Sequence, residues 1–351
     1  MNRDVAIVSF AQAPSVRRTN LTEAQLLLPV INEAIASSGL DRRELGFVCS
    51  GSADYLAGQP FAFVGNLEAV GAWPPISESH VEMDGAWALY EAWIRLQHGD
   101  IDSALVYSSG ISSMGSPREV LSLQLDPYYL MPLWPDSVSM AALQARAVLE
   151  EGRYDEKSFA EVAARNRGVA KDNPNAQVTA DTDVDALLDE PYFVDPLRRH
   201  DCPPISDGAA AMVIVAGDKA KELCERPAWI RGMDHRVETH YPGARELTRS
   251  VSTELAGKAL GGCDGVEVAE LAAPFSFQEL LLRDALDLGE STQINPSGGA
   301  LAANPLMVAG LTRIGEAANQ IMEHGRGRVL GHATAGPCLQ QNLVCVLEGE
   351  R

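Results

Sequence analysis

Small and apolar residues occur in long runs along the chain, separated by short turns rich in glycine and proline. Residues 85–89 are small or apolar almost without a break, and apolar residues recur at 92–94 and 96. This spacing predicts a helix that is buried on most of its faces. We expect Asp84 to be its N-cap, because an aspartate side chain accepts hydrogen bonds from first-turn amides. Gly99 is suited to the left-handed geometry that ends a helix.

Shorter apolar runs predict buried strands, and the first of them is mostly apolar, as in a covered parallel sheet. These runs lie at 4–10, 45–49, near 81, 103–109, 206–215, 228–236, 265–271, 328–333 and 342–347. The order strand, loop, buried small-residue helix, glycine, strand occurs at 80–109 and again at 293–334. This repeat predicts two duplicated β-α-β halves of an α/β protein, packed through buried helices that begin near Gly85 and Gly299.

Residues 112–200 interrupt this plan. They contain serine, glycine and proline, with helical patterns at 137–151 and 159–171. Such an excursion from a sheet predicts a lid or substrate-binding subdomain. We therefore divide the chain into an N-terminal half (1–111 and 201–224), a loop domain (112–200) and a C-terminal half (225–351).

Composition narrows the possible partners. The formal charge is −20, with 28 basic and 48 acidic residues, which argues against nucleic acid or an anionic membrane as partner. The six cysteines have no CxxC pair and no metal-like spacing, so we expect reduced core thiols and no metal site. No apolar run approaches the roughly 20 residues that span a bilayer. These features predict a cytoplasmic protein.

Two motifs carry a family resemblance. Ile205-Ser-Asp-Gly-Ala-Ala-Ala211 follows a Cys-Pro pair, and Asn295-Pro-Ser-Gly-Gly299 opens a late helix. With residues 99–106, 166–174 and 332–336, they make the chain resemble the thiolase superfamily over nearly its whole length. The resemblance is to the lipid-transfer-protein branch, which is similar to sterol carrier protein thiolases. It implies a five-layered αβαβα fold with an inserted loop domain, and a coenzyme A thioester as substrate or ligand, with no further cofactor.

The chain departs from this family at the positions where the resemblance implies catalysis. The family's nucleophilic cysteine matches Glu82, or Asp84 if the turn is shifted. The histidine of its Gly-His-Pro motif matches Asn304, and its second cysteine falls near His332. The family's His-Asp pair falls at 272–273, where this chain has two alanines. Without a cysteine activated by a base, covalent acyl transfer is not available.

The remaining polar residues have both a catalytic and a structural interpretation. Glu82 is a general base in an apolar pocket, or an ionised cap or salt-bridge partner. His332 shuttles protons or makes a structural hydrogen bond. Asn304 would hold an oxyanion or a water molecule. If the turn is shifted, Asp84 takes the place of Glu82.

The resemblance also implies substrate contacts. Gly298 and Gly299 of the second motif are candidates, as is Gln278, which matches the family's Asn-Glu pair. Three cations, Arg165, Arg167 and Lys171, lie where relatives bind the coenzyme A nucleotide and would meet its phosphates, unless they form only a solvated helix face.

Two functions follow. The first is a thiolase-like subunit that supports carbon–carbon cleavage or acyl transfer on a bulky lipid or steroid acyl-coenzyme A by a partner. The second is an acyl-coenzyme A lyase of the retro-aldol type, with Glu82 and His332 as acid and base. If the chain is active, we expect lyase or acyltransferase chemistry and no cysteine-dependent thiolysis. We expect a homodimer, or a heteromer with a thiolase-like or OB-fold subunit, formed through the strand at 103–109 as a sheet edge.

Overall fold

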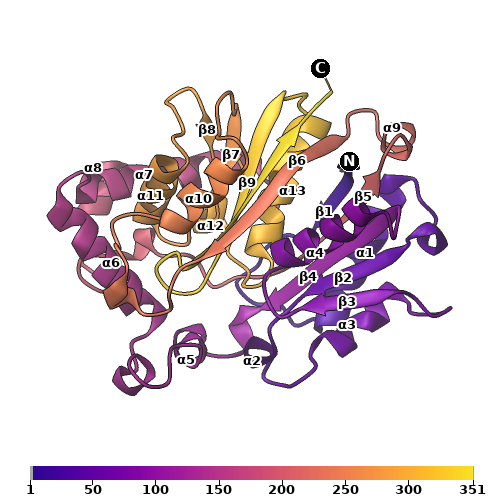
Figure 1. Ribbon diagram of the computed structural model, residues 1–351. Helices are drawn as coiled ribbons and strands as arrows, with labels where there is room; N and C mark the ends of the chain where they lie inside the picture. Colours follow the sequence, from indigo (N-terminus) through magenta and orange to yellow (C-terminus); the bar gives the residue numbers. More distant parts are fainter. Residues whose placement is uncertain (1–2, 351) are drawn as a thin grey trace.

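The computed structural model describes residues 3–350 as two similar halves that share one mixed sheet (Figure 1). Its strand order is β3-β2-β4-β5-β1-β6-β10-β9-β7-β8. The first half contributes β1 (Val5–Gln12), β2 (Phe47–Gly51), β3 (Glu78–Val81), β4 (Ser103–Ile111) and β5 (Asp207–Ala216). The second contributes β6 (Ala228–Val237), β7 (Val268–Glu270), β8 (Gln293–Ile294), β9 (Arg328–Ala335) and β10 (Gln341–Glu348). The second half repeats the order of the first outward from the β1–β6 pair, so the predicted duplication is confirmed.

Helices cover both faces of each half and fill the space between them. The outer layer of the first half is α1 (Glu23–Ser38) with α3 (Phe63–Val70), preceded by the short α2 (Asp54–Ala57). The central layer is α4 (Gly85–His98) and α13 (Ala309–Met322), which contact each other and strands on both sides. The outer layer of the second half is α10 (Val251–Ala259) and α11 (Ser276–Ala285), while α9 (Lys219–Leu223) follows β5. This is the expected five-layered αβαβα arrangement.

Three apolar clusters correspond to these layers. One joins α4 and α13 to the inner faces of both halves and includes Leu89, Leu311 and Ile314, each fully buried. A second lies under α1 and includes Ile31 and Tyr107. The third lies under α10, α11 and the loop segment. Successive side chains along a strand point to opposite faces of the sheet. In each half, one face of the sheet therefore packs on the central helices and the other face on the outer helices.

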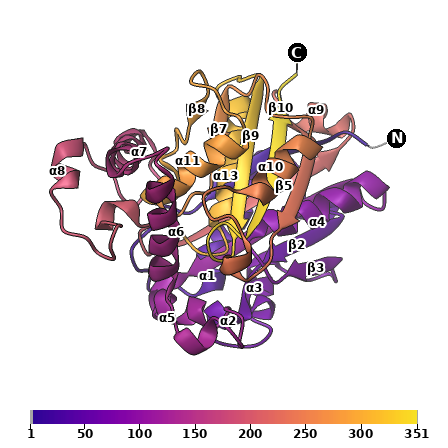
Figure 2. The same cartoon turned by 60° about the vertical axis from the view of Figure 1, so that its left-hand side comes forward.

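The segment between β4 and β5 stands beside the sheet and contributes no strand to it within the described residues. Figures 1 and 2 show most of it, including α6, α7 and α8, at one side of the molecule, with α5 below. Its helices are α5 (Pro117–Ser122), α6 (Ser137–Glu151), α7 (Glu156–Val169) and α8 (Val184–Leu188). None of the helices within residues 3–350 is long and apolar enough to cross a membrane.

Two expectations are corrected. The second central helix begins at Ala309, not near Gly299. The short α12 (Gly299–Ala302) precedes it, with Ala303 as its C-cap, and Pro305 follows α12. Proline cannot donate the backbone hydrogen bond that a continuous helix needs. The strand at 103–109 is also not a sheet edge: β4 pairs with β2 and β5, and the edges are β3 and β8.

Candidate functional site

A cavity of about 200 Å³ lies where the first turns of α4 and α13 meet the loop segment. Asp84 and Ala309, at the starts of the two helices, form part of its floor. Asn304 and Thr334 approach from the C-terminal half. The loop segment adds Leu121, Leu125, Gln124, Pro135, Ser137, Met140 and Ala141. The cavity is mostly apolar with few polar groups, which is typical of small-molecule sites.

Asp84 is the point where the two central helices are joined. Its Oδ1 accepts hydrogen bonds from the backbone N–H groups of Ala86 at 2.9 Å and Leu311 at 3.0 Å. Its Oδ2 accepts one from Gly310 at 2.9 Å. The side chain thus caps α13 as well as α4, and the N-cap expected for α4 is confirmed. Burial raises the pKa of the Asp84 carboxyl, and the three backbone donors oppose that shift.

This capping depends on a glycine in the second helix. A Cβ at Gly310 would lie 2.5 Å from the Cβ of Ala333 and 2.6 Å from Oδ1 of Asp84. Only a residue without a side chain leaves room for the carboxylate between the helices. The N-terminus of a helix attracts negative charge. In this chain the carboxylate of Asp84 supplies that charge to both α4 and α13.

Asn304 and Gln278 lie in the cavity wall, as the sequence suggested. The Asn304 backbone N–H donates to Ser206 Oγ at 3.0 Å, which holds the residue in the gap between α12 and α13. Gln278 donates from Nε2 to Gln144 Oε1 at 3.0 Å, so its amide is tied to α6. Of the two, Asn304 is the better placed to contact a ligand oxygen.

Glu82 lies outside the cavity, so the structure does not place it in the apolar pocket expected for a general base. Its side chain is exposed and accepts a hydrogen bond from the Asp54 backbone N–H at 2.5 Å. His80 Nε2 lies 3.6 Å from its other carboxylate oxygen. The chain turns between Glu82 and Asp84, which leaves one carboxylate outside and brings the other between the helices.

His332 also lies outside the cavity. It is fully buried in β9, and its Nε2 is 3.2 Å from Asn342 Oδ1. Its neighbour Ala333 packs in the central cluster, so His332 faces the opposite layer, under α10. Burial lowers the pKa of His332 to about 3, so the ring is neutral at physiological pH. A neutral ring away from the cavity does not support the proton-shuttle interpretation.

The three cations of the loop segment all have acceptors within the chain. Arg165 forms an ion pair with the buried Glu279, and Lys171 pairs with Asp181. Arg167 donates to the backbone carbonyl of His200 at 3.2 Å, and burial lowers its pKa. None of the three lines the cavity. Their contact with coenzyme A phosphates stays a prediction.

The two glycines of the late motif are packing positions in this structure. A Cβ at Gly298 would lie 2.5 Å from that of Ala170, and one at Gly299 would meet the side chain of Asn295 at 2.8 Å. Both residues have positive φ and bring α12 close to the loop segment. Neither lines the cavity.

Tyr55 and Cys338 are among the cavity residues that sequence reasoning missed. Tyr55 belongs to the short α2, in a stretch without periodicity, and burial raises the pKa of its hydroxyl. Cys338 was assigned to the core and is buried, but it also lines the cavity. Its Sγ lies 3.5 Å from the Met140 carbonyl, and burial raises the thiol pKa to about 11. The positive φ of Cys338 and Leu339 comes from a turn that local sequence did not indicate.

The cavity therefore offers hydrogen bonding without an activated nucleophile. Among the described lining residues there is one cysteine, Cys338, and no histidine. A thiol with a raised pKa is protonated near neutral pH and reacts poorly. Within residues 3–350, no three His, Cys, Asp or Glu side chains are grouped to hold a metal ion.

Comparison with known proteins finds similar sequences. No protein-family model matches the sequence. Acetyl-CoA acetyltransferase of Methanothermobacter thermautotrophicus is 25% identical over 365 residues, covering 94% of each chain. Sterol carrier protein 2 of Gallus gallus is 27% identical over 266 residues, which is 67% of this chain and 48% of that protein.

Solved structures agree on the fold. A structure described as Ltp2-ChsH2(DUF35) aldolase superposes with a TM-score of 0.82 at 20% identity, over 99% of this chain and 98% of that one. Human mitochondrial 3-ketoacyl-CoA thiolase has a TM-score of 0.78 at 16% identity, with 99% of each chain covered. With sequence similarity to thiolase-superfamily proteins along nearly the whole chain and the same arrangement of duplicated halves, the chain has the thiolase fold.

Proposed function

We propose that this chain is a thiolase-like subunit that binds an acyl-coenzyme A and supports carbon–carbon cleavage or acyl transfer by a partner subunit. The acyl group is a bulky lipid or steroid side chain. The chain itself does not carry out cysteine-dependent thiolysis. The cavity at the junction of the two central helices would hold the thioester end of the ligand.

The observation that carries this proposal is the hydrogen bonding of Asp84. Both carboxylate oxygens are engaged by backbone donors of α4 and α13. A carboxylate held this way joins the starts of two helices, so its observed contacts are structural ones. With the Cys338 thiol protonated and no histidine in the described lining, the cavity lacks a nucleophile paired with a base.

The comparisons support a coenzyme A thioester as ligand. Two of the similar proteins are named for action on such thioesters, an acetyl-CoA acetyltransferase and a 3-ketoacyl-CoA thiolase. The cavity is mostly apolar, and Asn304 adds an amide that would bind a thioester carbonyl oxygen. Both features suit an acyl group entering from the loop segment.

A partner subunit is supported by exposed apolar residues near the cavity. Leu123, Tyr128, Tyr129 and Leu133 are 55%, 82%, 68% and 76% exposed, and the segment that carries them adjoins the lining residues Leu121, Gln124, Leu125 and Pro135. We call residues 123–134 the apolar segment. Exposed apolar groups of this kind mark interaction surfaces. The structural neighbour Ltp2 is named together with ChsH2, a DUF35 protein, which supports a heteromer of this chain with an OB-fold or thiolase-like subunit.

A lyase remains the second candidate because of Tyr55. Glu82 and His332 do not reach the cavity, so the acid–base pair first considered is not available there. Tyr55 does line the cavity, and its raised pKa keeps its hydroxyl protonated at neutral pH. A protonated phenol near Asn304 would act as a general acid in a retro-aldol step.

The test uses the purified chain alone and the complex recovered with a tagged chain from its source cells. The chain alone should bind acetyl-coenzyme A by calorimetry. It should release no acetyl-coenzyme A from acetoacetyl-coenzyme A and free coenzyme A. Cleavage activity should appear only in the complex and survive Tyr55→Phe. Thiolysis by the chain alone, or an acyl-cysteine adduct detected by mass spectrometry, would overturn the proposal; activity of the chain alone that is lost in Tyr55→Phe would establish the lyase instead.

A further inference from the structure

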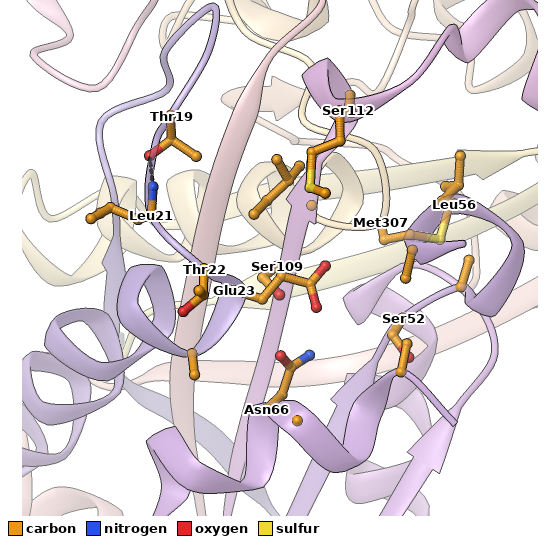
Figure 3. Close-up of a pocket in the computed structure, with 18 of the residues that line it drawn as sticks. Thr19, Leu21, Thr22, Glu23, Ser52, Leu56, Asn66, Ser109, Ser112 and Met307 are labelled. Carbon is orange, nitrogen blue, oxygen red and sulfur yellow. Dashed lines mark hydrogen bonds between the residues drawn. The ribbon is translucent and has the colours of Figure 1, made fainter. Parts of the chain in front are cut away.

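A second cavity, larger than the first, lies on the other side of the α2 turn (Figure 3). Its volume is about 570 Å³, and it opens to the surface. The start of α1, helices α2 and α3, and the end of β4 surround it. The function proposed above does not involve this cavity.

Polar groups without partners are gathered in this cavity. Ser52, Asn66 and Ser109 are only 6%, 2% and 4% exposed, and all three line it. Ser52 Oγ, Asn66 Oδ1 and Ser109 Oγ have no hydrogen-bond partner among the residues that the structure describes. Buried polar groups are nearly always paired in folded proteins. Three unpaired oxygens in one cavity therefore indicate a ligand that supplies hydrogen bonds.

Glu23 further defines the chemistry of that ligand. Glu23, Asn66 and Ser109 all line the cavity, and Figure 3 shows them among its lining residues. Burial raises the pKa of the Glu23 carboxyl, and the Asn66 side chain partly offsets that shift. The unpaired groups are two serine hydroxyls, which donate and accept hydrogen bonds, and one amide oxygen, which accepts them. A hydroxyl group both donates and accepts, whereas a carboxylate would be repelled by Glu23.

Only a thin wall separates the two cavities. Leu306 and Met307 line both of them, and the neighbours Tyr55 and Leu56 line one each. The Met307 carbonyl accepts from the Gly85 N–H at 2.9 Å, which holds its backbone at the start of α4. Its unbranched side chain can rotate between several rotamers. Movement of this side chain would join the cavities beside the first turn of α4.

We propose that the second cavity receives the distal, hydroxyl-bearing end of the acyl group whose thioester end lies in the first cavity, with the chain passing beside Met307. Ser52, Asn66 and Ser109 bind the hydroxyl group. This inference rests on the proposed function and adds to it the class of acyl group: a chain long enough to reach both cavities, hydroxylated at its far end, and uncharged there.

The test compares three ligands by calorimetry: acetyl-coenzyme A, decanoyl-coenzyme A and 10-hydroxydecanoyl-coenzyme A. The hydroxylated chain should bind at least about 10-fold more tightly than the plain chain, the scale of one or two well-placed hydrogen bonds. Ser109→Ala should reduce that preference and leave acetyl-coenzyme A binding unchanged. Equal affinity for the two long ligands would overturn the inference.

Gly65 provides a variant that fills the cavity. It lies in α3, lines the cavity, and a Cβ there would meet nothing within 4 Å. Gly65→Leu should weaken both long ligands at least about 10-fold and spare acetyl-coenzyme A, whereas Gly65→Ala, the matched control, should bind all three normally. If Gly65→Leu binds the two long ligands as tightly as the parent chain does, the cavity does not hold the acyl chain. The same conclusion follows if the variant only weakens self-association of the chain and leaves ligand binding unchanged. Failure of acetyl-coenzyme A itself to bind would overturn the proposed function as well.

Discussion

At the scale of single residues, the site depends on which of two nearby carboxylates points inward. Glu82 remains exposed, while Asp84, two residues later, is 4% exposed and accepts three backbone hydrogen bonds. The difference comes from the turn that follows β3, in which the Met83 N–H donates to the Val81 carbonyl at 2.8 Å. One carboxylate consequently stabilises the starts of two helices, and the other lies between His80 and the start of α2.

Replacing Asp84 tests this double capping. Asp84→Asn keeps the size of the side chain but presents an amide N–H₂ to at least one of its backbone donors. We expect the free energy of unfolding to fall by about 1–3 kcal/mol, because two helix caps weaken together. Urea denaturation measures the change. Asp155→Asn is the control, since Asp155 caps α7 alone; an equal loss in the two variants would contradict the double role.

His332 predicts a specific dependence of stability on pH. Its pKa is about 3 in the folded chain, against an ordinary histidine value of 6.5 that we take for the unfolded chain. A depressed pKa contributes stability above pH 6.5, and that stability is lost as the pH falls toward 3. The slope attributable to this residue is about 1.4 kcal/mol per pH unit inside that window.

Denaturation of His332→Gln between about pH 4 and pH 7 isolates this contribution. The variant should lose stability less steeply than the parent chain as the pH falls, whatever its stability at neutral pH. His324→Gln, at an exposed position, should follow the parent curve. Parallel curves for all three proteins would show that His332 does not titrate as its burial requires.

At the scale of elements, the break between α12 and α13 determines the shape of the first cavity. The chain leaves α12 at Ala302, and Asn304 enters the cavity wall before α13 begins at Ala309. If one helix ran through this stretch, the direction of the Asn304 side chain would be fixed by its position on that helix. The break instead lets the first turn of α13 meet Asp84.

Glycines in two helices should respond oppositely to alanine. Gly310→Ala in α13 introduces a Cβ within 2.6 Å of Asp84 Oδ1 and 2.5 Å of the Ala333 Cβ, so we expect a loss of about 1–3 kcal/mol. Gly65→Ala in α3 enters open space and should gain about 0.5–1 kcal/mol from helix propensity. Thermal or urea unfolding compares them; stabilisation by Gly310→Ala would contradict the close contact of the central helices.

At the scale of the whole molecule, the sheet leaves two free edges, β3 and β8, and the loop segment carries the apolar segment beside the first cavity. The formal charge of −20 opposes close approach of two copies except where apolar contact compensates. Association through the apolar segment places a partner next to the ligand. It would also cover side chains that are otherwise in water.

Serine substitutions in the apolar segment test this surface. Tyr128→Ser and Leu133→Ser together should weaken association with the partner at least about 10-fold while changing the unfolding free energy by no more than about 0.5 kcal/mol. Leu255→Ser, on α10 and 50% exposed, is the control. Sedimentation velocity measures the association. Equal association of the parent chain, the double variant and the control would place the interface elsewhere.

Local hydrogen bonding and periodicity allowed much of the fold to be predicted from sequence. Asp84 caps α4 and Gly99 ends it with φ of 81°, as predicted. The helix predicted at 137–151 has those bounds in the structure, and the strand predicted at 103–109 lies within β4. Caps and amphipathic spacing depend on residues within a turn or two of each other, so a single sequence carries that information.

The composition of the site was decided by tertiary structure. Whether His332 faces the cavity depends on strand register, since one step along β9 reverses the direction of the side chain. Tyr55 and Cys338 reach the cavity from turns that have no periodic signal. The duplicated order of strands was visible in the sequence, but the meeting of α4 and α13 at one carboxylate was not. That contact joins residues 226 and 227 positions apart, and only packing of the two halves brings them together.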